Sequence, residues 1–541
     1  MAILLNRVLL LVATLALSAC ALISDGAYTN EKLTPTAHDP HPPAAAPSQA
    51  SFRLRSERRA NGCDTVSKPP TNPKRQSQVL VLLALSGGGS RAAYFSALTM
   101  LEMERQKAEV NGIQTDLLHE VDAISTVSGG GLAGAFYAVS HDPGEACAGH
   151  SKKVWNAEAV EELMPRDYLR RWIMNWFNPV NAARFWFTYY DRTDIMAQTF
   201  ANNLFGDDLS IAELNPLRPN LILNATSGTA LDDGLIRFGE AFTFTDEDFR
   251  RICSDIEKYS VARGVMASAT FPGAFNFMTL RDYHNTCMSE AQGMVEPPPR
   301  YLHVFDGGNS DNLGLTSLRR VIWEALEDRD GDHPHLAYRR VIVVLVDSFV
   351  QSPGADPTQP DPRSSTDFIV DSNFLDATDS LLQANRERLL DQFRRGDLFP
   401  FAPGGTKKIA QDYCTNFFHD LEVRECATDP ARWAKINKDI SDKLKFVHVQ
   451  FSATPDVAEG CASPSCLLRQ LNRITTSFKL SNDVDSRTGL TDREAIACAV
   501  PAIFGRAADT DARKACGKLR LETRTRLQDD WDEVRRILRN P

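Results

Sequence analysis

Apolar runs and helical spacings mark the start of the folded part of the chain near Gln78. Val79 to Leu85 reads VLVLLAL, and this run without a polar residue predicts a strand buried on both faces of a parallel sheet. After three glycines, apolar residues recur at the spacing of one helix face, at Tyr94, Leu98 and Leu101. The pattern therefore predicts a strand, a glycine turn and a helix, which begin an α/β unit.

The same pattern recurs further along the chain. Val121 to Val127 predicts a second strand, and Gly130 to Val139 predicts the helix that follows it. Further apolar runs predict buried strands at residues 220–224, 301–305, 341–346 and 446–451. Because helical patterns lie between these runs, we expect a three-layer α/β/α fold around a mainly parallel central sheet.

The first twenty residues have the shape of a secretory signal. Arg7 precedes an apolar run from Val8 to Leu17, which is too short and wrongly flanked for a membrane span. The ending Leu17-Ser18-Ala19-Cys20 resembles a bacterial lipobox, in which the signal is cut before the cysteine and the thiol is acylated. A plain signal or an uncleaved anchor is the alternative. Ala21 is not Asp, so the resemblance implies a lipoprotein of the bacterial cell envelope, at the outer membrane and facing the periplasm.

The cysteines agree with export. Eleven are present, and without Cys20 an even ten remain, which suits an oxidising compartment. Sequential pairing is the simplest scheme, with Cys461–Cys466 and Cys414–Cys426 as the most plausible short loops, although buried free thiols remain an alternative. The spacings build no zinc site, and we expect no metal and no cofactor.

The composition limits the classes of binding partner that we expect. Hydrophobic residues make up 43% and charged residues 24%, which is ordinary for a globular protein. The net charge of −10 gives no sign of a basic stripe, so we expect no nucleic-acid partner. The same charge argues against electrostatic docking on anionic lipid.

Two glycine clusters lie at predicted strand-to-helix junctions. In S-T-V-S-G-G-G, Ser128 stands where a strained turn would push its hydroxyl above the sheet, as in a nucleophile elbow. The usual G-x-S-x-G is altered, because Thr126 takes the first glycine position while Gly130 keeps the last. A packing turn with a helix-capping serine is the alternative.

The other cluster, Gly87-Gly88-Gly89, precedes Ser90 and Arg91. Consecutive glycines expose backbone N–H groups that can bind an oxyanion, although a tight packing turn would need the same residues. A phosphate loop is disfavoured, since neither G-x-x-x-x-G-K-[ST] nor G-x-G-x-x-G is present. Arg91 either braces this loop or holds a lipid phosphate, and bracing is favoured.

A third cluster supplies a candidate base, which a serine nucleophile needs. Asp306 ends an apolar strand and is followed by Gly307 and Gly308. Burial at such a strand end would raise the pKa and the basicity of the carboxylate. Alone, Asp-Gly is also ordinary turn chemistry.

Taken in order, the three clusters resemble the patatin-like phospholipases over about residues 79–320. The segment Ala267 to Gly273 resembles that family's A-S-x-A-x-P-G stretch, with Thr270 in place of the second alanine. Ala92, where the family often has glycine, and Thr126 are further departures. The resemblance implies Ser128 as nucleophile, Asp306 as sole base, and Gly87, Gly88 and Gly89 as the oxyanion loop. Arg91, Gly130, Gly307, Gly308, Asp311 and Asn312 would be supports.

The resemblance implies a serine lipid-acyl hydrolase, a phospholipase A or esterase of lipid degradation, acting on phospholipid or another acyl ester. With the lipobox and the proline-rich residues 25–76, we expect the chain to divide into a signal peptide (1–19), a lipid-anchored flexible tether (20–76), a patatin-like catalytic core (77–325) and a C-terminal part (326–541). The last would complete the sheet, with a strand ending at Asp347 and the stretch Arg473 to Leu480, and add a solvated helix after Ala507. No oligomeric state, headgroup preference or acyl-position preference is indicated.

Other interpretations stay open. A catalytically inactive scaffold lipoprotein would keep the fold to bind lipid or protein, and a nucleotide-binding protein would use the first glycine cluster as a phosphate cradle. A Ser-His-Asp triad is disfavoured, because strand alternation points His303 away from Asp306 and predicts a packing role. The aromatic segment Trp155 to Phe205 forms either core helices or an acyl-binding wall or lid that touches membrane.

Overall fold

The computed structural model describes residues 30–34, 78–110, 112–144, 152–215, 217–231, 236–292, 298–327, 335–350, 372–399, 430–454, 466–506, 516 and 526–541. Their centre is an eight-stranded, mostly parallel sheet in the order β14-β13-β2-β5-β6-β10-β9, with β7 also paired to β6. Its strands are β2 (Val79–Leu85), β5 (Ala123–Val127), β6 (Asn220–Ser227), β7 (Ala241–Phe244), β9 (Met278–Asp282), β10 (Arg300–Asp306), β13 (Arg340–Asp347) and β14 (Leu444–Gln450).

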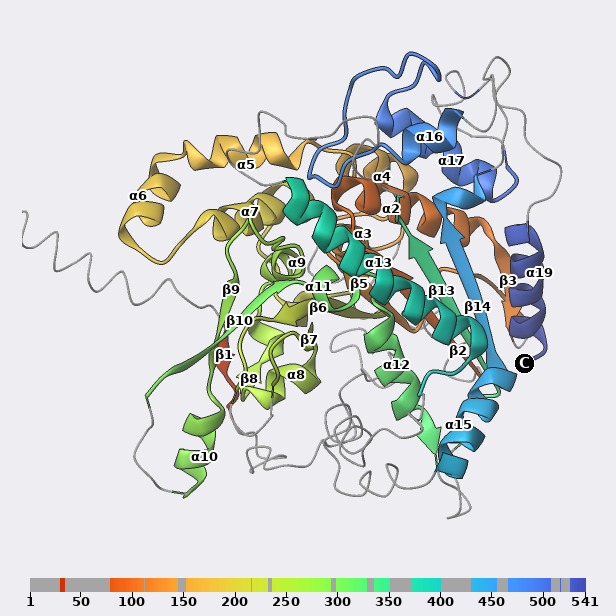
Figure 1. The fold of residues 1–541 in the computed structure, drawn as a ribbon, viewed down its shortest axis with the longest axis horizontal. Coiled ribbons are helices and arrows are strands. Elements are labelled where there is room, and N and C mark those ends of the chain that lie inside the picture. Colours follow the sequence, from red (N-terminus) through yellow and green to blue (C-terminus); the bar gives the residue numbers. More distant parts are fainter. Residues whose placement is uncertain are drawn as a thin grey trace, which may run out of the picture.

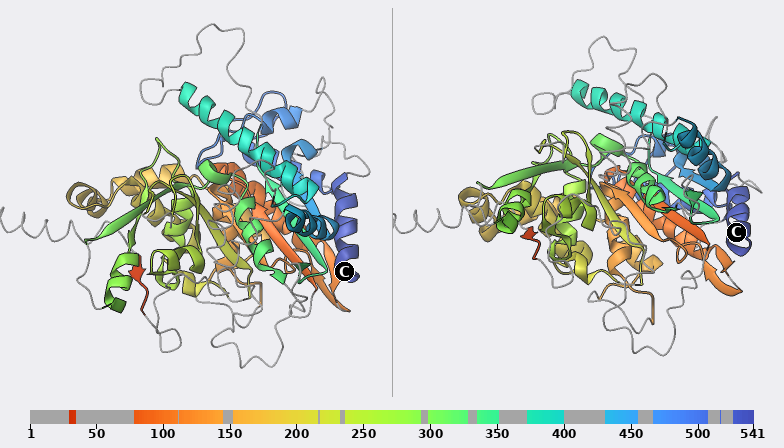
Figure 2. Two further views of the ribbon diagram at one scale, coloured as in Figure 1. Left: turned by 60° about the horizontal axis from the view of Figure 1, so that its bottom comes forward. Right: turned by 90° about the horizontal axis from the view of Figure 1, so that it is seen from below.

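Helices cover both faces of this sheet (Figures 1 and 2). Alternate residues of β2 enter two separate cores, with Val79, Val81 and Leu83 in one and Leu80 and Leu82 in the other. The first core lies under α2 (Gly89–Arg105), α3 (Gly129–Val139), α7 (Arg192–Phe200), α9 (Val261–Ser268), α16 (Cys466–Leu471), α17 (Asp492–Ile503) and α19 (Arg526–Arg539). The second lies under α12 (Leu315–Glu324), α13 (Ser372–Arg395) and α15 (Pro430–Lys443). The predicted three-layer α/β/α fold is confirmed.

Smaller elements surround these layers. They are β1 (Glu31–Lys32), β3 (Lys107–Val110), β4 (Ile113–Asp116), β8 (Ser254–Asp255), β11 (Leu326–Glu327), β12 (His335–Leu336), α4 (Ala157–Leu163), α5 (Tyr168–Trp176), α6 (Pro179–Phe187), α8 (Asp246–Arg251), α10 (His284–Gln292) and α11 (Gly308–Asp311). None of the helices in the described ranges is both long and apolar enough to cross a membrane.

The register of β6 determines where the glycine clusters meet. Asn224 pairs with Val127 of β5 and with Thr243 of β7, so these two strands flank β6 on opposite sides. The next residue, Ala225, pairs with β7 and with Asp306 of β10. Because a strand residue has one neighbour on each side, β5 and β10 must lie along the same side of β6. Their carboxyl ends therefore face each other.

The six predicted strands are all present, with bounds shifted by at most three residues. The stretch 473–480, however, forms no strand, and the prediction that it completes the sheet is wrong. Its backbone instead bonds to other segments: the carbonyl of Phe478 accepts hydrogen bonds from the amides of Tyr168 and Leu169. Beyond β13, the last strand of the sheet is β14.

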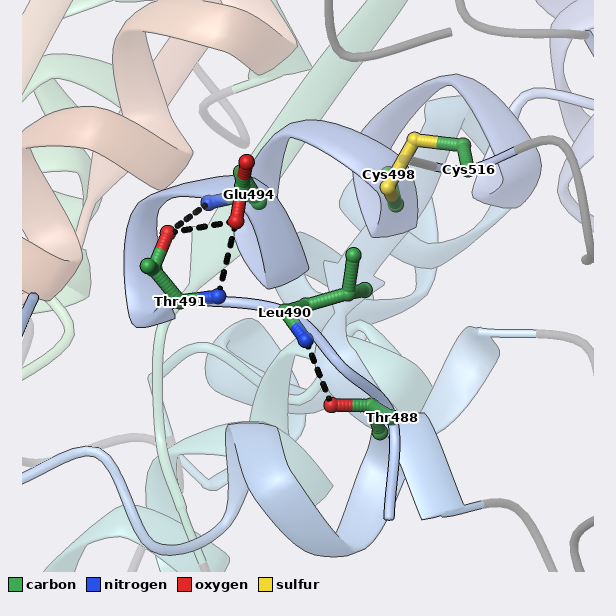
Figure 3. The surroundings of a disulfide bond; sticks show 6 residues. All are labelled: Thr488, Leu490, Thr491, Glu494, Cys498 and Cys516. Carbon is green, nitrogen blue, oxygen red and sulfur yellow. Dashed lines mark hydrogen bonds between the residues drawn. A yellow bond between two sulfur atoms is a disulfide. The ribbon is translucent and has the colours of Figure 1, made fainter. Parts of the chain in front are cut away.

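Two disulfides follow the sequential pairing, Cys253–Cys287 and Cys498–Cys516. Figure 3 shows the second beside the start of α17, where Thr491 and Glu494 form a reciprocal capping box. The other two predicted pairs are not tested. Cys414, Cys426 and Cys461 lie outside the described residues, and the side chain of Cys466 is not described. Cys20 and the predicted signal also lie outside the described residues.

Part of the predicted tether is held on the domain. Glu31 and Lys32 form an antiparallel pair with Asp255 and Ser254 of β8. Asn30 is buried, and its side-chain amide donates to Ser254 Oγ at 3.0 Å. The prediction of a flexible tether is therefore wrong for this short stretch.

The C-terminal helix α19 is also more than a solvated surface element. Its side chains Trp531, Val534 and Leu538 are buried in the first core. On its other face, Asp530 and Glu533 accept hydrogen bonds from Lys445 of β14, at 2.8 and 2.5 Å. The helix thus covers the edge of the sheet, which leaves fewer unpaired backbone groups exposed there.

Candidate active site

Ser128 lies in a strained turn between β5 and α3. Its backbone has φ 49° and ψ −119°, and Cys253 is the only other non-glycine residue with positive φ in the described part of the chain. A side chain two residues after Ser128 would not fit, since a Cβ on Gly130 would lie 2.5 Å from the Leu85 carbonyl oxygen. The turn matches the predicted elbow, although Ser128 is only 8% exposed.

Asp306 meets Ser128 where β10 ends against β5. The Ser128 hydroxyl lies close enough to the Asp306 carboxylate to favour its charged form. The amide of Gly308 donates a hydrogen bond to the same carboxylate, at 2.8 Å. Burial raises the pKa of Asp306 to about 6, because desolvation disfavours the charged form more than these two neighbours favour it. The carboxylate is therefore a stronger base than an exposed aspartate.

The segment 267–273 clamps the two turns together. Ser268 Oγ accepts a hydrogen bond from the Ser128 amide at 2.9 Å, and the Ser268 carbonyl accepts one from Gly307 at 3.1 Å. The next contact along the segment joins the Asp306 amide to the Thr270 carbonyl, at 3.2 Å. The stretch quoted for the family resemblance thus fixes the relative position of Ser128 and Asp306.

The glycine loop lies directly against this pair. A Cβ on Gly87 would be 3.3 Å from Ser128 Cβ, and one on Gly129 would overlap the Gly89 carbonyl. The amide of Gly87 is occupied, because it donates to the Asn312 carbonyl at 3.0 Å. For the amides of Gly88 and Gly89, no acceptor exists among the described residues. With the amino ends of α2 and α3 beside them, these N–H groups can receive negative charge.

Asp311 and Asn312 act on the loop through the backbone. The Asp311 carboxylate accepts from the amides of Leu313, Gly314 and Thr316 at 2.9, 3.1 and 2.6 Å. These bonds shape the turn that brings the Asn312 carbonyl to the Gly87 amide. The support role implied by the family resemblance fits these contacts.

Arg91 holds a segment that the sequence motifs did not identify. Its guanidinium donates to the Ile474 carbonyl and to Thr476 Oγ1. The next contact is made by Ser90, whose amide donates to the Ser477 carbonyl at 2.7 Å. Arg91 therefore braces the loop, as the sequence favoured. Because 474–477 carries no motif, only the folded structure places it here.

A cavity of about 920 Å³ lies next to β10, and neither Ser128 nor Asp306 is among its lining residues. Phe305 and Thr270, the neighbours of Asp306 in sequence and through a hydrogen bond, do line it. Much of the remaining wall is aromatic or apolar, with Tyr189, Pro272, Phe275, Phe277 and Tyr301. Such a wall suits an acyl chain better than a polar ligand.

His303 lines this cavity and takes no part in the Ser128–Asp306 pair. Its ring contacts Phe277 with 5.3 Å between centroids, and its Nδ1 lies 3.0 Å from Thr279 Oγ1. Burial lowers its pKa. Strand alternation predicted the direction of the side chain correctly, but the ring faces a cavity as well as its packing neighbours.

The fold and the site together define a three-layer α/β/α domain with a largely buried serine at a strand-to-helix turn beside a buried carboxylate. Residues 83–319 match the family model described as Patatin-like phospholipase. The chain therefore contains a patatin-like phospholipase domain, and this family supports a lipid acyl hydrolase in general. No curated protein matches the chain. The matched range includes both residues of the pair and all three glycine clusters.

Proposed function

We propose that the chain is a serine lipid-acyl hydrolase that cleaves fatty-acyl esters with Ser128 as nucleophile and Asp306 as base. One observation carries the proposal: Ser268 holds the turn of Ser128 against the end of β10, where the buried Asp306 carboxyl has its pKa raised to about 6. Near neutral pH this carboxylate is mostly ionised, yet basic enough to take a proton in the transition state.

The reaction proceeds in two acyl transfers. In the first, Asp306 takes the Ser128 proton while the oxygen attacks the ester carbonyl, and the amides of Gly88 and Gly89 receive the charge of the tetrahedral oxyanion. The carbon–oxygen bond of the ester then breaks, and the leaving alcohol or lysolipid takes the proton from Asp306. In the second, water gives its proton to Asp306 and attacks the acyl-serine, and the fatty acid leaves as Ser128 regains a proton.

The cavity and the family support the proposed substrate class. The aromatic and apolar wall of the cavity next to β10 supports an acyl chain as the group that is bound. A phospholipid is the proposed ester, and Cys20 the proposed acylation site of a lipoprotein of the bacterial outer membrane. No step requires a metal ion or a cofactor.

Substitution of the two reacting residues tests the proposal. Ser128→Ala and Asp306→Asn should each lower the hydrolysis of a short p-nitrophenyl ester and of phospholipid by at least about a thousandfold. Ser441→Ala, whose hydroxyl only caps the Arg395 carbonyl, is the matched control and should keep full activity. A fluorophosphonate probe should label the wild-type protein on Ser128 alone.

Two results would overturn the assignment. Ser128→Ala with wild-type activity would exclude Ser128 as nucleophile. A wild-type protein that neither hydrolyses any acyl ester nor reacts with the probe would favour the inactive scaffold, which binds lipid or protein without turnover.

A further inference from the structure

Helices α5 and α6 form a hairpin that projects from the body of the protein in all three ribbon views (Figures 1 and 2). Of the eleven large hydrophobic side chains that are exposed in the described residues, eight lie between Ile173 and Tyr189. Phe177 is 78% exposed and Trp186 is 76% exposed. The interpretation of the whole aromatic segment as core helices is therefore wrong for α5 and α6, although it holds for α7. A concentrated apolar surface of this kind indicates a binding site.

The two helices present apolar side chains on both their inner and outer sides. On the inner side, Tyr168 is buried in the core and Trp172 packs against it. Polar contacts add to these: Asn175 donates to Thr199 Oγ1 and Asn181 to Gln198 Oε1, both at 2.8 Å and both to α7. The outward aromatic side chains therefore have no need of the protein core, and a helix with such a face is suited to an apolar surrounding.

Charge on the hairpin differs in sign from the charge of the whole chain. Between residues 166 and 192 there are five arginines and two aspartates, a net charge of +3, whereas the whole chain carries −10. Arg166, Arg170 and Arg171 line a pocket of about 410 Å³ at the start of α5 together with Asp167, and Arg166 is paired with Glu162. The negative charge of the whole chain therefore does not describe this surface, where Arg170 and Arg171 are suited to contact anionic lipid.

The apolar surface is continuous with the cavity next to β10. Tyr189 lies two residues after α6, is exposed, and lines the cavity. Phe277, which is also exposed, lines the same cavity. A lipid layer in contact with the hairpin would therefore lie at the entrance of this cavity.

We propose that the α5–α6 hairpin docks on the surface of an anionic phospholipid bilayer. Phe177, Val180, Trp186 and Phe187 enter the boundary between headgroups and acyl chains, where aromatic side chains are favoured. The arginines at the start of α5 contact lipid phosphates. The inference rests on the proposed function only in that the docked lipid is also the substrate.

Vesicle flotation tests the docking without turnover. The full chain carrying Ser128→Ala and Cys20→Ala, so that neither hydrolysis nor acylation contributes, is mixed with vesicles of phosphatidylethanolamine and phosphatidylglycerol. In this background Trp186→Ser with Phe187→Ser should weaken vesicle binding by about a hundredfold. Val180→Asp should weaken it by at least about tenfold. Val484→Asp is the matched control, since Val180 is 64% and Val484 is 62% exposed, and it should bind normally.

The charge of the vesicle provides the second arm of the test. Phosphatidylcholine vesicles should bind less tightly, and Arg170→Glu should weaken binding to the anionic vesicles only. Circular dichroism and thermal unfolding must show that each variant is folded. Equal binding by wild type, the double variant and Val180→Asp would overturn the proposal. So would self-association that the double variant abolishes while vesicles are not bound, because the occupant would then be a second copy. Failure of ester hydrolysis leaves this binding assay unaffected.

Discussion

At the scale of single residues, the site combines two groups held in unfavourable states. Ser128 has a backbone conformation that few side chains adopt, and Asp306 is ionised in a setting that disfavours charge. Neither group relaxes, because Ser268 contacts both turns. The stability that is lost at Asp306 is the source of its basicity.

Replacement of Asp306 should therefore stabilise the protein as it abolishes activity. The pKa of Asp306 is raised from 3.8 to about 6 in the folded state, so the native protein binds more protons than the unfolded chain between these values. Its contribution to stability is largest below about pH 4 and is lost as the pH rises through about 6. The loss is about 3 kcal/mol, from about two pKa units at 1.36 kcal/mol each. Asp306→Asn removes this loss.

Urea unfolding at two pH values checks the sign. The free energy of unfolding of Asp306→Asn should equal that of the wild type at pH ~4 and exceed it by about 3 kcal/mol at pH ~8. The exposed Asp397→Asn should differ little from the wild type at either pH. A variant that is less stable than the wild type at the higher pH would show that Asp306 is not held at a cost.

At the scale of elements, apolar runs predicted six strands of the central sheet but not β7 and β9. β2 and β13 follow from continuous apolar sequence, which is typical of strands buried on both faces. β14 instead alternates, with only Val447 and Val449 buried. β7 and β9 were missed, since each is short and β9 alternates between buried and half-buried residues. The pairing of Ser128 with Asp306 could be expected from motif order alone. Its cause, the shared side of β6, depends on strand register, which no local pattern contains.

The segment 473–480 was misjudged because its apolar residues resemble a strand. Phe478 and Leu480 are buried two residues apart, as in a strand, yet the backbone crosses the glycine loop. A Cβ on Gly89 would lie 2.2 Å from the Ser477 carbonyl oxygen. The glycines of the loop are visible in the sequence. The sequence does not show that residues 474–480 are the segment that leaves no room for a side chain there.

Gly89→Ala should reveal this contact. Gly89 and Gly112 both have positive φ, 60° and 78°, but a Cβ on Gly112 meets nothing within 4 Å. Gly112→Ala should lower the free energy of unfolding by about 1 kcal/mol, from backbone strain alone. Gly89→Ala should lower it by at least about 3 kcal/mol and reduce kcat, since the 474–480 segment or the loop amides must move. Equal urea midpoints for the two variants would show that the segment yields freely.

At the scale of the whole molecule, the N-terminal segment restricts how an anchored protein can orient. Asn30 is fixed at the corner formed by β8 and β9, and only nine residues separate it from Cys20. The ten residue-to-residue steps from Cys20 to Asn30 span at most about 36 Å. If Cys20 carries the proposed acyl chains, the β9 side of the domain stays close to the bilayer. β9 also supplies Thr279 to the wall of the cavity, so the short link and the hairpin favour the same lipid surface.

Asn30→Ala should release the segment around β1 from the edge of β9. The Asn30 side chain accepts from the Arg281 amide at 2.8 Å and donates to the Arg281 carbonyl at 2.9 Å, so it satisfies the outer edge of β9. Its loss should weaken local docking by about 2 kcal/mol and speed exchange of the Arg281 amide about thirtyfold, while global stability changes little. Hydrogen–deuterium exchange on a peptide that spans β9 measures this. Glu31→Ala is the control, because it removes only an exposed ion pair with Lys258. Unchanged exchange in Asn30→Ala would mean that the segment does not hold the edge of β9.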